Sequence, residues 1–435
     1  MSWLRRVSPL SGSVLLALST VALACSDDGG EGADDEVGES AGESSDDGTD
    51  DTTETTGDDD ETTSDDAETS DDAETTTDTG EPEPATEPGC EDAEFYAVPE
   101  DPAERGPWAV GAKTVVIDGL TTEIWYPAQW GSEAGADLKG YDLRAFLPES
   151  EAAKIPDEKA PPQVCDCYDD LPIDAAHGPY PVVVFVHGTA SWRSQSLSQV
   201  THWASRGFVV VSSDHPGLML GDILGPLCGL PGSQQDLSGD TDAVLAALAA
   251  PSGDWAFLDG LIDMERMAVS GHSAGGSAAA NQADKPGMRV SIPMASGQPV
   301  VANPAIESSL FLGGNADGVV PYSSTQSGYA GTAAPKRLVG IENAGHLAFS
   351  DICEIENDEG QDILEVAVEA DVCGASLAGF LFDCSDAFVA PEIATAIINH
   401  SSTAVLEEVL KCQDDDAFAE FEASYPDVAE FLQEL

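Results

Sequence analysis

A series of apolar runs with helix-like segments between them is the feature that most constrains how this chain can fold. PVVVFVHG (181–188) is apolar almost throughout, as in a strand that is buried on both faces. Similar runs follow at 207–217, 266–276, 309–318 and 336–346, and the segments SQSLSQVTHWASR and DTDAVLAALAA between them have helical spacing. Strands that alternate with helices predict an α/β fold, with a mostly parallel central sheet covered by helices. KTVVIDG and TTEIWYPA, within 113–128, predict an antiparallel start to that sheet.

Polar residues stand at or just after the ends of these predicted strands. They are His187, Asp214, Ser273, Asp317 and His346. A buried strand does not need such residues for its own packing. In open α/β sheets the active site lies at the carboxyl ends of the strands, so the pattern predicts a functional site at that edge.

The segment VSGHSAGGSAAA (269–280) places Ser273 between a predicted strand and a predicted helix, with glycines two residues before and after it. The backbone of so sharp a turn is strained, and side chains at 271 and 275 would collide. The pattern G-x-S-x-G therefore predicts a nucleophile elbow, which exposes the serine hydroxyl near the positive end of a helix. The alternative is a glycine-rich turn whose serine only caps the helix.

A serine nucleophile needs a base, and the base needs a group that orients it. In this type of fold the chain order is serine, acid, histidine. His346 follows a predicted strand in NAGHLAF, whereas His400 lies in a helical segment and is expected to be a surface or packing residue. Asp317 follows the preceding strand in LFLGGNADGVVP, and its alternative role is to cap a loop. We predict a triad of Ser273, Asp317 and His346.

The oxyanion of an acyl-transfer intermediate needs two backbone N–H donors. We expect them to be Ala274, directly after the nucleophile, and Thr189, in the loop after VVVFVHG. His187 is expected to shape that loop and not to react. The candidate substrate-binding residues are Trp192, Leu218 and Met219, and the alternative for Trp192 is packing against the following helix.

The chain resembles the α/β-hydrolase superfamily, in the branch of dienelactone hydrolase-like proteins, platelet-activating-factor acetylhydrolases and cutinase-like polyester hydrolases. The segments that carry the resemblance are DGLTTEIWYPA, PYPVVVFVHGTASWRSQS, WASRGFVVVSSDHPG, MERMAVSGHSAGG, GNADGVVP and AGHLAFSDIC, in family order. The resemblance implies the same triad and the same two oxyanion donors as the spacing does. Two departures from the family pattern weaken any inference about the substrate from this resemblance. They are a cysteine-bearing tail after His346 and the segment around Cys165 and Cys167, and both could cover the pocket.

Residues 26–89 are rich in Ser, Thr, Asp, Glu and Gly, and the segment is predicted to be a disordered acidic tether. The catalytic domain is expected over 90–352, and a helical extension over 353–435 is expected to pack on it or cover it. The whole chain has 81 acidic against 16 basic residues, a net charge of −65. This charge disfavours nucleic acid and anionic lipid as partners.

The first 25 residues read as an export signal. Arg5 and Arg6 precede an apolar stretch from 14 to 23 that is too short for a comfortable membrane span. Ala-Leu-Ala-Cys at 22–25 resembles the lipobox of bacterial lipoproteins, with Cys25 as the lipidated residue, and also fits an ordinary A-x-A cleavage site. We expect a lipoprotein in the periplasm or at the cell surface, or otherwise a secreted protein.

The chain has nine cysteines, and an even number remains when Cys25 is set aside. In an exported protein this number predicts disulfides, although the pairing stays open. We do not expect Cys165 and Cys167 to bond to each other, because the ring would be strained. No metal site is expected, because no Cys-x-x-Cys or His-x-x-x-His spacing is present.

The leading hypothesis is an extracytoplasmic serine hydrolase that cleaves carboxylic esters through an acyl-enzyme, without a cofactor. We expect a monomer that acts on a small-molecule, lipid or polymer ester and that contacts a membrane only through its lipid anchor. A phospholipase or platelet-activating-factor acetylhydrolase-like activity and a cutinase-like activity on polyesters are alternatives within that class. Amide or thioester hydrolysis by the same triad is a further alternative, and a non-catalytic surface protein on a hydrolase scaffold is the remote one.

Overall fold

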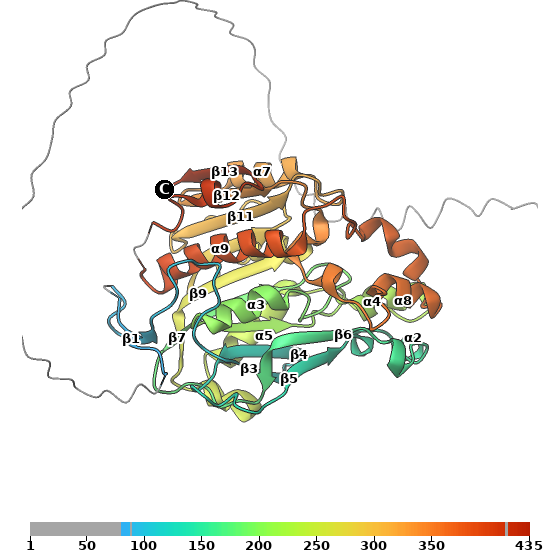
Figure 1. The fold of residues 1–435 in the computed structure, drawn as a ribbon, viewed down its shortest axis with the longest axis horizontal. Coiled ribbons are helices and arrows are strands. Elements are labelled where there is room, and N and C mark those ends of the chain that lie inside the picture. Colours follow the sequence, from blue (N-terminus) through green and yellow to red (C-terminus); the bar gives the residue numbers. More distant parts are fainter. Residues whose placement is uncertain (1–79, 88, 414–415) are drawn as a thin grey trace, which may run out of the picture. The chain divides into compact units, whose positions relative to one another are not determined.

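An 11-stranded sheet runs through the part of the chain that the structure, a computed structural model, describes: residues 80–87, 89–413 and 416–435 (Figure 1). The strand order is β13-β12-β11-β10-β9-β7-β8-β4-β3-β6-β5, and the run from β12 to β8 is parallel throughout. Antiparallel pairing at β4–β8, β3–β4, β5–β6 and β12–β13 extends the sheet on both sides. The predicted export signal, Cys25 and most of the predicted acidic tether lie outside the described residues.

The apolar runs of the sequence form strands of the large sheet, as predicted. The strands that no run predicted are β13 at one edge, β5 and β6 at the other, and β10 inside the sheet. A separate two-stranded sheet pairs β1 with β2. The strands are β1 Pro84–Ala85, β2 Phe95–Tyr96, β3 Val110–Ile117, β4 Leu120–Pro127, β5 Leu138–Asp142, β6 Pro162–Asp169, β7 Tyr180–Val186, β8 Val209–Ser213, β9 Ile262–His272, β10 Met288–Met294, β11 Ser308–Gly314, β12 Lys336–Ile341 and β13 Val428–Glu434.

Helices cover both faces of the sheet. The α-helices are α2 Glu149–Ala152, α3 Leu197–Ser205, α4 Leu220–Leu227, α5 Leu237–Leu248, α6 Ala274–Asn281, α7 Tyr322–Gly331, α8 Ile363–Glu369, α9 Pro391–Leu410 and α10 Phe421–Ser424. The short 3₁₀ helices are η1 Leu143–Phe146, η2 Asp157–Lys159, η3 Gly253–Leu258, η4 His346–Phe349, η5 Ile352–Glu354 and η6 Ala375–Leu381.

Side-chain alternation along β7 shows how the two layers form. Val183 and Phe185 face a core shared with α3 and α9, whereas Val182 and Val184 face the core under α5 and α6. Both sets of side chains are buried, which accounts for the continuous apolar run in the sequence. Burial on both faces requires a covering layer on each side, and the helices between the strands supply it.

The C-terminal extension contributes to the same fold. α9 packs on α3 and on the sheet, and it is the long orange helix that crosses the strands in Figure 1. The buried Glu407 of α9 accepts two hydrogen bonds from Arg206, each 2.9 Å long. The extension is not helical throughout, because β13 adds an antiparallel edge strand to β12.

The cysteines form four pairs in the structure: Cys90–Cys412, Cys165–Cys167, Cys228–Cys373 and Cys353–Cys384. The expectation that Cys165 and Cys167 would not pair with each other is contradicted. Both lie on β6 and point to the same buried face, since residues two apart in a strand share a side, and their Cα atoms are 5.0 Å apart.

β1 lies within the segment that was predicted to be disordered, so ordered structure begins before residue 90. None of the helices in the described residues has the length and apolar character that crossing a membrane requires.

Candidate active site

Ser273 lies at the turn between β9 and α6, with φ of 59° and ψ of −118°. Few residues other than glycine adopt a positive φ, and such strain is typical of functional sites. A Cβ at Gly275 would overlap with the carbonyl oxygen of Val186, and one at Gly271 would overlap with that of Gly275. The two glycines are therefore needed for the close approach of the turn to β7, as the spacing predicts.

Ser273, His346 and Asp317 lie in one hydrogen-bonded chain at the carboxyl ends of β9, β11 and β12. The Oγ of Ser273 is 3.0 Å from Nε2 of His346, and Nδ1 of His346 is 2.8 Å from Oδ2 of Asp317. An ionised carboxylate only accepts hydrogen bonds, so Nδ1 carries the proton and Nε2 is free to accept from the hydroxyl. The His346 and Asp317 side chains are buried, whereas Ser273 remains partly exposed.

Asp317 is held by the loop that follows β11. Its Oδ1 accepts the N–H groups of Val319 and Val320, both at 2.8 Å, which leaves Oδ2 for the histidine. The carboxylate therefore has a fixed orientation before any substrate binds. This arrangement fixes both the direction and the tautomer of the imidazole.

Of the two predicted oxyanion donors, Ala274 follows the nucleophile directly and Thr189 lies in the loop after β7. Ala274 is the first residue of α6, where a helix leaves its N–H groups without intrahelical partners. The loop of Thr189 comes close to Ser273, because a Cβ at the neighbouring Gly188 would be 3.4 Å from the Ser273 Cβ. In the described part of the chain, no group accepts a hydrogen bond from the N–H of Thr189 or of Ala274.

A second set of hydrogen bonds, which the sequence reading did not identify, joins the parts of this site. The N–H of Gly188 donates to Oε1 of Gln195 at 2.6 Å, and Nε2 of Gln195 lies 3.2 Å from Nδ1 of His272. Nε2 of His272 lies 2.9 Å from the carbonyl oxygen of His346. The loop of Thr189, the turn at Ser273 and the loop of His346, here called the histidine loop, are thus connected through buried side chains. The position of His272 directly before Ser273 in G-H-S-A-G could have pointed to it, but nothing in the sequence pointed to Gln195.

Burial keeps the two accessory histidines neutral. It lowers the pKa of His187 to about 3, and it lowers the pKa of His272 well below its usual range. Nδ1 of His187 donates to the carbonyl of Gly188, and its Nε2 accepts the N–H of His215. These contacts fit the expectation that His187 shapes the loop.

The candidate substrate residues differ in their surroundings. Trp192 is 2% exposed, stacks on Phe146 with ring centroids 5.5 Å apart, and donates to Gln163, so its surroundings are those of a packing residue. Leu218 is buried in an apolar cluster with Val186 and Ala278, and Ala274, the residue after the nucleophile, packs against this cluster. Met219 is half-buried and pairs its backbone with Ser191. A substrate-binding role for the three stays a prediction.

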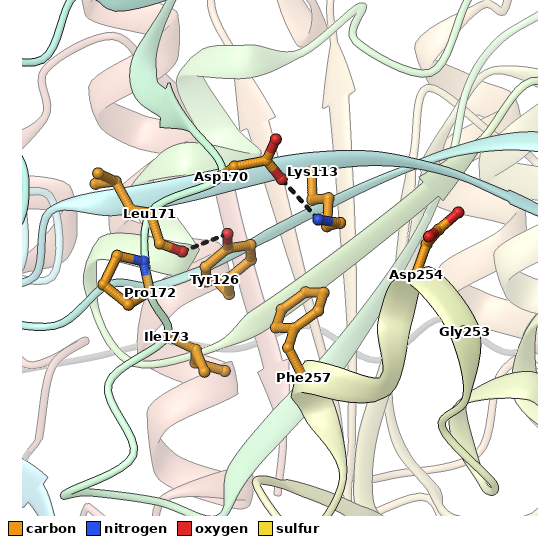
Figure 2. Close-up of a pocket in the computed structure, with 9 residues that line it drawn as sticks. All are labelled: Lys113, Tyr126, Asp170, Leu171, Pro172, Ile173, Gly253, Asp254 and Phe257. Carbon is orange, nitrogen blue, oxygen red and sulfur yellow. Dashed lines mark hydrogen bonds and ion pairs between the residues drawn. The ribbon is translucent and has the colours of Figure 1, made fainter.

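A cavity of about 370 Å³, whose lining residues are labelled in Figure 2, includes none of these residues. Tyr126 and Lys113 line it together with Phe257 of η3, and Lys113 pairs with Asp170. Tyr126 stands near the end of β4, which runs antiparallel to β8, so the cavity faces the amino ends of the parallel strands. It has no part in the site around Ser273.

One group in the described residues has the donor atoms of a metal site close together: Glu151, Cys228 and Cys373. The two sulfurs are paired with each other, and Glu151 accepts the N–H of Cys373 and an ammonium hydrogen of Lys154. The donors are therefore already engaged within the protein, and this group does not support metal binding.

Asp351, shortly after His346, is a buried carboxyl that accepts hydrogen bonds from the N–H and hydroxyl of Ser198. Burial raises its pKa to about 7, against the action of the Ser198 hydrogen bonds. In the unfolded chain the pKa of an aspartate is about 3.9. Between about pH 4 and about pH 7, the folded protein therefore holds a proton on Asp351 that the unfolded chain has released. This proton binding stabilises the folded state at low pH, and the stabilisation is lost as the pH rises through about 7.

We expect Asp351→Asn, which is neutral at every pH, to raise Tm relative to the wild type by a few degrees at pH 8 and by less at pH 5. Thermal unfolding at both pH values measures the difference. Asp358→Asn, at an exposed position in the same loop, is the control and should show no such pH dependence. An equal Tm change at both pH values for Asp351→Asn would contradict the raised pKa.

The sheet, its helical layers and the order of the site residues along the chain define the class of fold: the protein has the α/β-hydrolase fold. Residues 158–217 match the family model of platelet-activating factor acetylhydrolase, isoform II. The fold is similar to that of a ferulic acid esterase from Streptomyces cinnamoneus, with a TM-score of 0.53 and 19% sequence identity, over 77% of this chain and 98% of the esterase. No curated protein matches the chain. The family match and the fold together support an ester-hydrolysing enzyme.

Proposed function

We propose that the protein is a serine hydrolase of carboxylic esters that works through an acyl-enzyme on Ser273. The observation that carries the proposal is the hydrogen-bonded chain from the Ser273 hydroxyl through His346 to Asp317, at the edge of the sheet where α/β folds place their sites. The matched acetylhydrolase family and the esterase with a similar fold support the same class of reaction.

The geometry supports the following sequence of steps. Ser273 Oγ attacks the ester carbonyl while Nε2 of His346 takes its proton, and Asp317 stabilises the imidazolium that forms. The N–H groups of Thr189 and Ala274 would hold the oxyanion. His346 then gives the proton to the leaving alcohol, and a water molecule, activated by the same histidine, releases the acyl group.

We further propose that the enzyme acts outside the cytoplasm, with Cys25 as its lipid anchor or with the signal cleaved. The signal-like N-terminal sequence supports this proposal, and so do the four cysteine pairs, since disulfides persist mainly in oxidising compartments. Small acyl esters, oxidised or short-chain phospholipids and polyesters are the substrate classes under consideration. Likeness of fold does not select among them.

A fluorophosphonate probe tests the proposed nucleophile directly, because it phosphonylates a serine that a neighbouring base activates. We expect one label per chain, on the peptide that contains Ser273, and hydrolysis of p-nitrophenyl esters by the unlabelled protein only. The series from acetate to palmitate then reports the acyl length that the site accepts. A chain that is folded, takes no label and cleaves none of these esters would contradict the proposal.

A further inference from the structure

The C-terminal extension contacts the loop of His346 directly. The carboxylate of Asp383 accepts the backbone N–H of His346 through Oδ2 and that of Leu347 through Oδ1, the latter at 3.0 Å. A Cβ at Gly345 would overlap with this carboxylate, so the approach requires glycine at that position. The contact joins residues 37 positions apart in the chain.

The segment 382–389, here called the strap, is attached on both sides of the histidine loop. Cys384, the residue after Asp383, is paired with Cys353, which follows the histidine loop. Phe382 packs in the apolar cluster that contains Leu347. Farther along the strap, the N–H of Val389 donates to the carbonyl of Asn343 at 3.0 Å. These anchors hold the Asp383 carboxylate against the loop.

The backbone of His346 is consequently held at both of its polar groups. Its N–H donates to Asp383, and its carbonyl accepts from the buried His272. The side chain contacts Ser273 and Asp317 at the same time. An imidazole that must accept a proton from one group and return it to another depends on this alignment, and a shift of about 1 Å can cost on the order of 100-fold in rate.

We propose that Asp383 is a positioning residue for the base of the reaction, held in place by the strap; this inference rests on the proposed function. Each of the two carboxylate oxygens accepts one N–H group, whereas an amide has only one acceptor oxygen and cannot accept at both places. In Asp383→Asn one oxygen keeps one N–H, and the new NH₂ group faces the other donor. The repulsion and the unpaired N–H move the loop, and the imidazole moves with it.

The test compares Asp383→Asn with Asp386→Asn, which removes the same charge at an exposed position of the strap. Active sites are counted by fluorophosphonate titration, and kcat and KM are measured on p-nitrophenyl acetate per titrated site. We expect kcat of Asp383→Asn to fall about 10- to 100-fold with KM within about twofold, and Asp386→Asn to match the wild type. A role in folding alone would lower the number of titrated sites and leave kcat per site unchanged, and that result would overturn the proposal.

A second variant covers the case in which Asp383→Asn does not fold. Cys353→Ser combined with Cys384→Ser keeps the carboxylate but removes the covalent anchor of the strap, and we expect the same fall in kcat per site. Unchanged kcat in this folded double variant would count against the strap as the anchor of Asp383. If the wild type takes no label and cleaves no ester, the proposed function fails together with this inference. A labelled, active wild type with an unaffected Asp383→Asn overturns the role of Asp383 alone.

Discussion

Ser273→Ala is expected to lower kcat for p-nitrophenyl acetate by about 10⁵-fold or more, because no other group in this mechanism forms the acyl-enzyme. The hydroxyl is partly exposed and its contact with His346 is the one that the reaction uses. Alanine has the same backbone demands at a positive φ as serine, so the elbow keeps its shape. Initial rates on the purified chain, measured against the buffer rate, give the ratio, and Tm should change by less than about 2 °C.

Ser277→Ala is the matched control for this variant. Ser277 lies one turn farther along α6 and makes its side-chain contact with the hydroxyl of Ser296 at 3.0 Å, away from His346. We expect it to keep wild-type kcat. If Ser273→Ala retained a substantial part of the activity, a nucleophile other than Ser273 would have to be sought.

The convergence of Ser273, Asp317 and His346 could be expected from the sequence because of a property of parallel sheets. Strands that run in the same direction end at the same edge, so residues just after three buried strands meet there. The apolar runs mark those strands clearly because the last seven residues of β9 and all residues of β11 and β12 are buried on both faces of the sheet. Local patterns were therefore enough to place the site, although its catalytic role remains a proposal.

Strands without such a pattern were not predicted. β10 carries Pro293 and lies in the centre of the sheet, although proline in a strand argues for an edge position. β13 carries Glu430, Gln433 and Glu434 and has no buried side chain, so its sequence does not show a buried face. Its strand form depends on pairing with β12, about 90 residues earlier in the chain, and local propensity does not report such pairing.

The residues that hold the site together also have no local signature. Gln195 and Asp383 act through contacts with Gly188 and His346 that exist only in the folded chain. A glutamine in a loop and an aspartate beside a cysteine are common, and neither spacing nor composition marks them. The pairing of Cys165 with Cys167 likewise follows from a strand that turns both side chains to one buried face.

Asp317 offers a test of the tautomer on which the proposed reaction depends. Its Oδ1 accepts the N–H groups of Val319 and Val320, and an asparagine would keep its oxygen there. The amide nitrogen then takes the place of Oδ2 and donates to Nδ1 of His346. The imidazole must carry its proton on Nε2, toward Ser273, where it cannot accept the proton of the hydroxyl.

Asp317→Asn is therefore expected to lower kcat by about 10⁴-fold with little change in Tm, because the two loop hydrogen bonds remain. The rate of fluorophosphonate labelling at Ser273 should fall with kcat, since both reactions need the same base. Glu342→Gln is the control: Glu342 follows β12, pairs with Asn315 and has no contact with His346. A labelling rate that stays at the wild-type value in Asp317→Asn would mean that His346 is oriented without the aspartate. In that case the contacts of its backbone with Asp383 and His272 would be sufficient to align the ring.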